Sequence, residues 1–542
     1  MARYAYQRFP YRTPPELSGQ TASSCPVTII GAGPVGLSAA INLALQGIPV
    51  LVLDDNDVVS IGSRAICWSK RTLEIFHRLG VGQRMLEKGV TWQVGRLFHR
   101  DTEVYSFDLL PEAGHRMPAF INLQQYYVEQ YLVERAAEFP DLIDIRWKNR
   151  VTGVSPTADR VNVTVETPDG PYTIASDWVI ACDGARSPTR EMLGLAFEGQ
   201  VFEERFLIAD VEMKADFPSE RWFWFEPPFH QGQSALLHKQ PDNIYRIDLQ
   251  LGWDTDPEEE KKPENVIPRI KAIVGDRTFE IDWVSVYTFQ CRRLARFVHG
   301  RVIFAGDSAH VVSPFGARGG NGGIQDVDNL GWKLAMVIRG EAPPALIESY
   351  STERVHGADE NILNSSRSTN FMTPKSDAER AFRAAALDLA RDHGFARKLV
   401  NSGRLSLPCN VAGFALQTPA TDNYGISPGS VALDAPVMDK TGKRSFLLDH
   451  LGGSFQLLST GDSAACPDLG LPMVRISPDG LQDVEGLRDV DGLIARRWGQ
   501  GMTYLIRPDQ VVAARFRNPT SLEIRAALVR ATANTGSEGA RS

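Results

Sequence analysis

The segment VTIIGAGPVGLSAAINLALQGIPVLVLD constrains the fold more than any other part of the chain. An apolar strand pattern leads into Gly31, Gly33 and Gly36, which are spaced as GxGxxG. Apolar residues then recur at helical spacing, and a second apolar strand ends at Asp54. This order of strand, glycine turn, helix, strand and acid is typical of an α/β dinucleotide-binding fold.

The three glycines have different physical roles in such a turn. Gly31 permits the sharp turn, Gly33 lets the backbone approach a pyrophosphate, and Gly36 allows close packing of helix and strand. The helix N-terminus then faces the phosphates, and the acid at the end of the second strand can accept a hydrogen bond from a ribose hydroxyl. The motif alone does not separate NAD from FAD, but its place near the start of a long chain favours FAD.

Length and charge narrow the class of protein. A chain of 542 residues is too long for one core, so we expect two or three domains. The net charge of -8 gives no electrostatic reason to bind nucleic acid or an anionic membrane. No segment reaches the roughly 20 apolar residues of a membrane span, and the N-terminus lacks the apolar core of a signal peptide. Six scattered cysteines without a CxxC favour a cytoplasmic protein with no disulfide framework and no metal site.

Two later segments repeat the pattern of an apolar strand that ends in an acid. DWVIACDGARSPTR places Asp183 after a strand, and GRVIFAGDSAH does the same for Asp307. Ligand-binding groups collect at the carboxyl ends of strands in α/β folds, although each acid could also only cap a turn. PFGARGGNGG follows, with five glycines in ten residues. Because glycine costs backbone entropy, this is either a loose loop or a place where a ligand approaches the backbone closely.

Together these three segments resemble the single-component flavoprotein aromatic hydroxylases, the group of 4-hydroxybenzoate hydroxylase, phenol hydroxylase and pentachlorophenol monooxygenase. GAGPVG is similar to the first FAD motif of that family, CDGARSPTR to its Asp-Gly motif, and GDSAHVVSPFGARGGNGG to its Gly-Asp motif. The resemblance implies an α/β protein with a Rossmann-like FAD-binding domain, an interleaved β-sheet substrate domain and a C-terminal thioredoxin-like domain.

The expected domain boundaries follow from the motifs and from shifts in composition. We expect an extended arm at 1–24, an FAD-binding domain at 25–197 and 292–365, a substrate-binding sheet domain at 198–291, a helical connector at 366–410 and a thioredoxin-like domain at 411–542. Cys466 stands alone in the last region, which excludes dithiol chemistry there. A packing module, or a contact in a homodimer, is the expected role of this region.

The resemblance also implies a set of FAD contacts. Asp54 would bind the adenosine ribose, Asp183 would touch FAD and the path of the nicotinamide cofactor, and Asp307 would bind ribityl hydroxyls. Arg64 and Gln125 would contact the ribityl–pyrophosphate part, although a surface charge and an exposed helix position are the competing interpretations. The complete cofactor set is Gly31, Gly33, Gly36, Asp54, Arg64, Gln125, Val151 through its backbone to adenine, Asp183, Asp307, Gly319, Gly320 and Asn321.

The glycine-rich loop has a physical role in this interpretation. A helix N-terminus offers unpaired N–H donors and partial positive charge, which would stabilise negative charge on the pyrimidine of a reduced flavin. Side chains at Gly319, Gly320 or Gly322 would hold the ring away from those amides, and Asn321 tolerates unusual backbone angles. Two interpretations of Arg318 stay open: its guanidinium approaches the flavin ring or a substrate anion, or it faces solvent.

The substrate side is less determined. The resemblance places the Pro314 carbonyl there, and the strand-like, aromatic-rich region 198–291 is expected to cover the ring. Tyr245 and Arg246 are candidate contacts for a phenol or its carboxylate, and His230, His238 and Tyr287 are further polar candidates. Trp222 and Trp224 are expected in the sheet core. No catalytic base is assigned, because the aspartate that phenol hydroxylase carries near RTLE has no counterpart.

The predicted function is that of an FAD-dependent monooxygenase, with NAD(P)H and O2 as co-substrates, which hydroxylates a phenolic aromatic substrate through a flavin hydroperoxide. A single GxGxxG implies that NAD(P)H binds without a domain of its own. The alternatives are an FAD oxidoreductase of the same fold that does not hydroxylate and an inactive flavin-binding scaffold. The phenol, the choice of NADH or NADPH and the oligomeric state stay open.

Overall fold

A mixed sheet built on parallel strands carries the glycine turn in the computed structural model, which describes residues 4–18, 24–252, 254–400, 405–461, 469–477 and 486–534. The strand order β17-β18-β11-β1-β2-β8 places β1 in the interior of the sheet, between β11 and β2. β9 and β10 extend β11 as an antiparallel meander. The bounds are β1 Cys25–Ile30, β2 Val50–Asp54, β8 Ile143–Trp147, β9 Arg150–Pro156, β10 Val161–Thr167, β11 Gly170–Ala181, β17 Val298–His299 and β18 Val302–Phe304.

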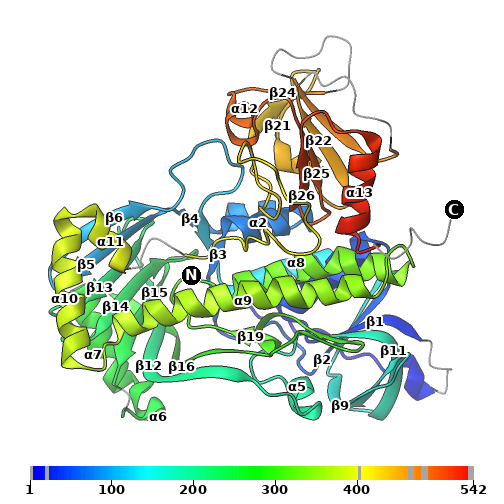
Figure 1. Cartoon of the computed structure of the whole chain (residues 1–542). Helices are drawn as coiled ribbons and strands as arrows, with labels where there is room; N and C mark the ends of the chain where they lie inside the picture. The colour runs from blue at the N-terminus through cyan, green and yellow to red at the C-terminus, as the bar shows by residue number, and fades with distance from the viewer. Residues whose placement is uncertain are drawn as a thin grey trace.

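Helices bury the faces of this sheet. The apolar runs at the centre of the sheet are buried almost completely, as expected for strands covered on both sides. α1 packs against α8, which in turn packs against α9, and these two long helices cross the middle of the molecule (Figure 1). The helices around this layer are α1 Pro34–Leu45, α2 Lys70–Arg78, α3 Gly82–Lys88, α4 Gln125–Ala136, α5 Pro188–Met192, α8 Gly319–Ile338 and α9 Ala345–Met372.

A second large sheet lies beside the first, in the order β19-β16-β12-β15-β14-β13-β5-β6. It includes β5 and β6, which the sequence analysis placed within the FAD-binding domain, so the boundary at 198 is wrong for these two strands. β5 reaches the sheet because it pairs in parallel with β13. The bounds are β5 Val94–His99, β6 Thr102–Asp108, β12 Glu198–Met213, β13 Arg221–Phe225, β14 Ser234–Lys239, β15 Ile244–Leu251, β16 Phe279–Arg293 and β19 His310–Val311.

The two faces of this sheet differ in their environment. The outer face packs on α7 (Pro263–Val274) and forms an apolar core with Val266 and Ile270 of that helix. Trp222 and Trp224 pack against this core, in agreement with their expected place. The inner face looks towards α9, α10 and the segment before α8, and side chains alternate between the two faces. The shorter elements nearby are α6 Pro257–Glu260, α10 Asp377–Asp392 and α11 Gly394–Val400.

The C-terminal region contains a seven-stranded mixed sheet in the order β21-β20-β24-β23-β22-β25-β26. Figure 1 shows it on the side of α8 and α9 opposite the two large sheets. Cys466 lies outside the described residues. The bounds are β20 Pro436–Met438, β21 Arg444–Phe446, η3 Leu447–His450, β22 Gln456–Thr460, β23 Met473–Ser477, β24 Leu487–Asp489, α12 Leu493–Trp498, β25 Met502–Ile506, β26 Val512–Phe516 and α13 Ser521–Ala531.

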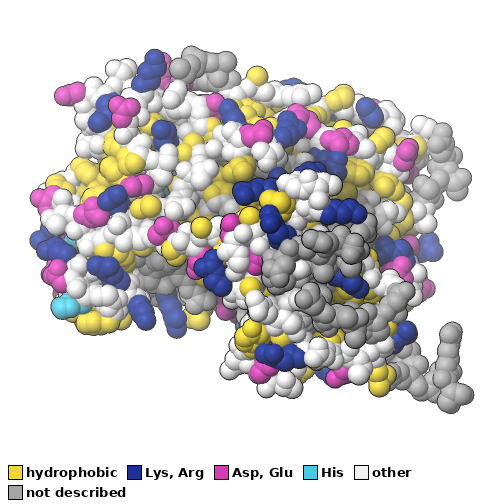
Figure 2. All heavy atoms as spheres, turned by 90° about the horizontal axis from the view of Figure 1, so that it is seen from above, with side chains coloured by type: hydrophobic (Ala, Val, Ile, Leu, Met, Phe, Trp, Pro, Cys, Tyr) yellow, Lys and Arg dark blue, Asp and Glu magenta, His cyan; other side chains and the backbone are white. Residues whose placement is uncertain are grey.

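Small elements complete the fold around the central layer. A three-stranded sheet joins β3 (Cys67–Ser69), β7 (Phe120–Asn122) and β4 (Val90–Trp92), and two 3-10 turns cover Pro15–Ser18 (η1) and Gly306–Ser308 (η2). The expected N-terminal arm is extended over 4–14 and is held by stacking of Phe9 on Trp147. No helix in the described ranges is both long and apolar enough to cross a membrane. Figure 2 shows basic and acidic side chains interspersed over one face.

Candidate cofactor and substrate site

The glycine turn between β1 and α1 separates into two packing positions and one open position. Gly31 has φ +104, and a Cβ there would lie 2.6 Å from the carbonyl oxygen of Cys182. A Cβ at Gly36 would lie 1.9 Å from the carbonyl oxygen of Gly31. A Cβ at Gly33 meets nothing within 4 Å. The protein itself therefore requires the first and third glycines, whereas the space beside Gly33 at the start of α1 suits a phosphate.

Asp54 supports this turn from the end of β2. Its Oδ2 accepts a hydrogen bond of 2.6 Å from the N–H of Ala32, and its Oδ1 accepts one of 2.9 Å from the N–H of Asn56. Burial raises the pKa of Asp54 despite these bonds. A carboxylate has about four acceptor sites, so capacity for a ribose hydroxyl remains.

Asp183 provides the clearest sign of an absent partner. Its Oδ2 accepts a hydrogen bond of 2.9 Å from the N–H of Thr189 at the start of α5. Its Oδ1 is buried and has no hydrogen-bond partner among the described residues. Because buried polar atoms are nearly always paired, this oxygen fits a donor that belongs to a bound molecule.

Asp307 and Arg64 come from distant segments but lie within electrostatic range of each other. The Asp307 side chain is exposed, yet burial raises its pKa, and the charges of His310 and Arg64 act to lower it. Arg64 is exposed on the segment before β3, so both side chains are accessible to a ligand.

Gln125 forms hydrogen bonds within the protein, and Val151 lies on an edge strand. The Oε1 of Gln125 accepts from the N–H of Ala65 at 3.0 Å, and its Nε2 donates to Glu129 at 2.8 Å. This amide therefore positions the segment that carries Arg64. Val151 lies half-buried on β9, which pairs with β10 and with no other described strand. Its backbone is thus at a sheet edge.

The glycine-rich loop also separates into positions with different surroundings. The nearest atoms to a Cβ at Gly319 and Gly320 lie at 3.8 and 3.4 Å, which are ordinary contacts. At Gly322 and Gly323 a Cβ would come within 3.2 Å of His310 and 2.7 Å of Val35. Gly322 therefore faces protein at close range, which corrects its expected role, while a Cβ at Gly319 or Gly320 would make only ordinary contacts at the first turn of α8.

The side chain of Asn321 anchors the start of α8. Its Oδ1 accepts from the N–H of Ser69 at 2.9 Å, and its Nδ2 donates to the carbonyl oxygen of Cys67 at 2.9 Å. The amides of this first turn have no acceptor within the helix. Asn321 therefore fixes the direction in which they point.

Arg318 is buried, with 2% of its surface exposed, so the solvent-facing alternative is wrong. A Cβ at Gly316 would lie 1.8 Å from the Nη1 of Arg318, and Gly316 has φ +106. The guanidinium thus packs over this glycine, which serves both the turn and the space the arginine needs. The carbonyl of Pro314 accepts from the N–H of Ala317 at 3.0 Å and closes the same turn.

Tyr245 and Arg246 lie on opposite faces of β15, so the expectation that both contact substrate is wrong. Tyr245 is 1% exposed in the outer core, and its hydroxyl donates to the carbonyl of Ala215 at 2.7 Å. Arg246 forms a buried ion pair of 2.8 Å with Asp210 and donates to the carbonyl of Arg64 at 3.0 Å. Arg246 therefore holds the Arg64 segment against the sheet. The two-residue period of a strand already precludes both side chains from sharing a face.

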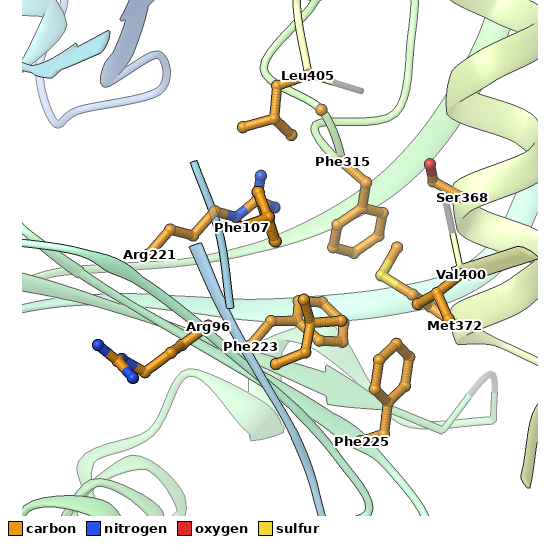
Figure 3. Close-up of a pocket in the computed structure, with 12 residues that line it drawn as sticks. Arg96, Phe107, Arg221, Phe223, Phe225, Phe315, Ser368, Met372, Val400 and Leu405 are labelled. Carbon is orange, nitrogen blue, oxygen red and sulfur yellow. The ribbon is translucent and has the colours of Figure 1, made fainter. Parts of the chain in front are cut away.

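A hollow between the inner face of the second sheet and the loop before α8 is lined mainly by apolar side chains, four of which are phenylalanines. It contains about 510 Å³ of space free of protein atoms, part of which is open to solvent. Figure 3 shows Phe223, Phe225 and Phe315 turned towards this space, with Met372 of α9 beside them. We call it the aromatic hollow, defined by Phe107, Arg221, Phe223, Phe225, Phe315 and Met372.

Sequence analysis did not single out the residues of this hollow. The signal was present in RWFWF, in which Arg221, Phe223 and Phe225 alternate with the two tryptophans and therefore share the inner face. Phe315 and Gly316 bring the hollow to the glycine-rich loop.

The structure also gathers His356, Glu360 and Cys409, whose ligand atoms all lie within 4.8 Å of one another, an arrangement that sequence spacing did not indicate.

Comparison with known proteins adds to this geometry. The family described as "FAD binding domain" matches residues 24–365. The 3-(3-hydroxy-phenyl)propionate/3-hydroxycinnamic acid hydroxylase of Mycolicibacterium smegmatis is 30% identical over 330 residues, which cover 60% of this chain and 58% of that protein. The 6-methylpretetramide 4-monooxygenase of Streptomyces rimosus is 29% identical over 535 residues, which cover 93% and 92%.

A solved structure shows the same fold over most of the chain. The flavin-dependent monooxygenase PieE, in complex with FAD and substrate, matches with a TM-score of 0.79 and 23% identity. The match covers 94% of this chain and 99% of that one. The architecture described above is therefore shared along nearly the whole chain.

Proposed function

The chain belongs to the FAD binding domain family, and on that premise we propose that it is an FAD-dependent monooxygenase that hydroxylates a phenolic aromatic substrate. The observation that carries this proposal is the aromatic hollow, which opens beside the loop at the start of α8. A binding space lined by phenyl rings and adjoining a flavin site suits an aromatic ring. The names of the two curated relatives, a hydroxylase and a monooxygenase, point to the same chemistry.

The residues fit FAD in three independent ways. Gly33 leaves open space where the backbone can approach a ligand, the first turn of α8 offers backbone amides that have no acceptor within the helix, and Asp183 has a buried oxygen without a partner among the described residues. Gly31, Gly33, Gly36 and Asp54 would hold the adenosine diphosphate. Asp307, Arg64 and Asp183 would face the ribityl chain and the nicotinamide cofactor, and Val151 would offer its backbone to adenine.

When bound, FAD accepts a hydride from NAD(P)H and activates O2 so that one oxygen atom reaches the ring. The first amides of α8, at Gly319, Gly320 and Asn321, stabilise negative charge placed before them. The phenyl rings of the hollow exclude water from the substrate. Gln125 and Arg246 hold the segment that carries Arg64 in place.

The C-terminal region supports a thioredoxin-like assignment, which we retain as a proposal. β22, β23 and β24 run parallel, β25 and β26 continue as an antiparallel pair, and α13 follows them. This region would serve packing or the contact of a homodimer. A cytoplasmic location is proposed with it, because the reaction consumes NAD(P)H.

The test is oxygen incorporation by purified, FAD-loaded protein. NADH and NADPH oxidation are followed with 3-(3-hydroxyphenyl)propionate and other phenols under ¹⁸O2, and products are weighed by mass spectrometry. We expect one ¹⁸O atom in the product for each NAD(P)H consumed with the preferred phenol. NAD(P)H oxidation that yields only a desaturated product would favour the oxidoreductase without hydroxylation. Bound FAD without any NAD(P)H oxidation across the phenols would favour the inactive scaffold.

A further inference from the structure

Arg221 lies at one end of the aromatic hollow with an unusual lack of partners. It begins β13, is half-buried, and lines the hollow next to Phe107 and Phe223. Figure 3 shows its side chain reaching towards Phe107. No hydrogen bond or ion pair to its guanidinium is found within the described parts of the chain. A guanidinium stays charged at all ordinary pH values, so this charge borders the hollow without a carboxylate in direct contact.

A neighbouring arginine shows the contrast. Arg96 on β5 also borders the hollow, but its side chain extends away from the phenyl rings in Figure 3. It donates to Glu220 at 2.6 and 2.9 Å and to Glu103 at 3.0 Å. The protein thus neutralises one arginine of this region with two carboxylates and leaves the other without a carboxylate in contact.

The groups around Arg221 are also incompletely paired. His238 is its direct partner across the β13–β14 ladder, and the Nδ1 of His238 has no partner among the described residues. The same holds for the buried Oδ1 of Asp248 on β15. Burial holds the pKa of His238 well below its usual range and raises that of Asp248 to about 6. Clusters of unmet buried polar groups are rare in folded proteins and are typical of ligand sites.

The remaining charged neighbours do not pair with Arg221 either. Burial lowers the pKa of Arg221, while the Cys67 thiol and Asp248 act to raise it, so both lie within electrostatic range. Arg246 carries the next positive charge on this face, but its guanidinium is already paired with Asp210. The Cys67 thiol donates to Asn122 at 3.2 Å. The available positive charge at this end of the hollow is therefore that of Arg221.

We propose that Arg221 binds a carboxylate on the aromatic substrate, so that the ring lies among Phe107, Phe223, Phe225 and Phe315 and extends towards Gly316. This proposal rests on the proposed function, and it narrows the substrate class from phenols in general to phenolic acids. A guanidinium forms two parallel hydrogen bonds with a carboxylate, and partial desolvation by the phenyl rings strengthens them. Arg221 is thus a residue that determines specificity and touches the substrate.

The test compares matched pairs of an acid and its primary amide. The probes are 3-(3-hydroxyphenyl)propionate and its amide, and 3-hydroxy-2-naphthoate and its amide. Each is titrated into FAD-loaded protein, and binding is followed by the change in the visible flavin absorption. We expect at least one acid to bind the wild type about tenfold or more tightly than its amide. In Arg221→Gln the affinity for that acid falls by roughly 10- to 100-fold, and the affinity for the amide stays within about threefold.

Two variants and two measurements control this result. Arg96→Gln removes an arginine of the same region whose charge is already paired, so the preference for the acid should persist. Arg221→Lys keeps the charge but loses the planar fork, so it should retain an intermediate preference. FAD content and the circular dichroism spectrum establish that Arg221→Gln is folded and loaded.

Three outcomes overturn the assignment: equal affinity of the wild type for acid and amide, an acid preference that survives Arg221→Gln, or no binding of either acid. These outcomes are separate from failure of the proposed function. If a neutral phenol gains ¹⁸O but acids do not bind more tightly than amides, the proposed monooxygenase activity is supported and the proposed role of Arg221 is contradicted. If acid binding depends on Arg221 but no probe is oxygenated, carboxylate binding by Arg221 is supported and the proposed hydroxylation is contradicted.

Discussion

At the scale of single residues, glycines that look alike in the sequence serve different purposes. Gly323 allows α8 to pack on α1 at Val35, and Gly316 accommodates Arg318. A Cβ at Gly320 would make only an ordinary contact, since its nearest atom would belong to Trp68 at 3.4 Å. Because packing within the protein does not require glycine at Gly320, we attribute this glycine to the proposed ligand.

Gly320→Ala should therefore weaken FAD binding without harming the fold. A methyl group at the start of α8 would occupy space that we propose for the flavin, and we expect the Kd for FAD to rise about tenfold. The melting temperature of the apoprotein should stay the same or rise, because alanine favours a helix by about 0.5–1 kcal/mol. Isothermal titration and thermal scans measure both quantities.

Gly323→Ala is the matched control for this prediction. Its Cβ would lie 2.7 Å from Val35 and 3.0 Å from the Cα of Gly306, so the fold should lose about 1–3 kcal/mol. If Gly320→Ala destabilised the apoprotein as much as Gly323→Ala, the interpretation that packing does not require glycine at Gly320 would be contradicted.

At the scale of elements, one buried carboxylate joins three of them. Asp326 on α8 accepts from the N–H of Gly306 at 2.9 Å, from His310 at 2.6 Å and from Arg354 on α9 at 2.6 Å. Burial alone would raise the pKa of Asp326, but the charges of His310 and Arg354 more than offset it and lower the pKa to about 2. The Gly-Asp motif is thus tied to both long helices, which positions Asp307 and the loop that follows.

Asp326→Asn should destabilise the protein and change its response to acid. Removing this charge leaves Arg354 buried without its partner, at a cost of about 3–5 kcal/mol. Because the folded-state pKa lies below the usual value of 3.8, the stabilisation is present above that pH and is lost as pH falls through about 2. Urea unfolding at several pH values between 7 and 3 measures the unfolding free energy, and the acid-side loss should be shallower in the variant. An identical pH slope in both proteins would contradict this account.

At the scale of the whole molecule, a buried ionic network joins the C-terminal region to the central helices. Arg507 donates to Glu353 of α9 at 2.8 Å and to Asp509 at 3.0 Å, and Lys333 of α8 donates to Glu353 at 2.8 Å. The side chains of Arg507 and Lys333 are completely buried. Burial lowers the pKa of Lys333 to about 8, although Glu353 acts to raise it. Such a network specifies one arrangement of the two parts, because any other would leave charges buried and unpaired.

Glu353→Gln should weaken the attachment of the C-terminal region. Lys333 would lose its carboxylate partner and Arg507 would keep only Asp509, so we expect a loss of about 3–5 kcal/mol and a broadened or divided unfolding transition in calorimetry. Glu348→Gln on the same helix removes only an exposed pair with Arg296 and should cost less than about 1 kcal/mol. Equal effects of the two variants would show that the network does not join the regions.

The predictable part of the site was local in sequence. The packing role of Gly36 could be assigned from the chain because it lies against Gly31 within one strand–turn–helix unit. The faces of β15 were predictable in principle from strand alternation, and Tyr245 was nevertheless misassigned because that rule was not applied. The inclusion of β5 and β6 in the second sheet was not predictable, since it depends on a parallel pairing with β13 across more than 100 residues.

The sequence by itself determined the dinucleotide turn, the strand-end acids and the glycine-rich start of a helix, since these depend on neighbours along the chain. Only the tertiary structure decided which of these groups are open to a ligand. The unpaired oxygen of Asp183, the open space at Gly33 and the position of Arg221 at the hollow all depend on which distant residues pack beside them. Packing and pairing are properties of contacts between segments, and no local pattern records them.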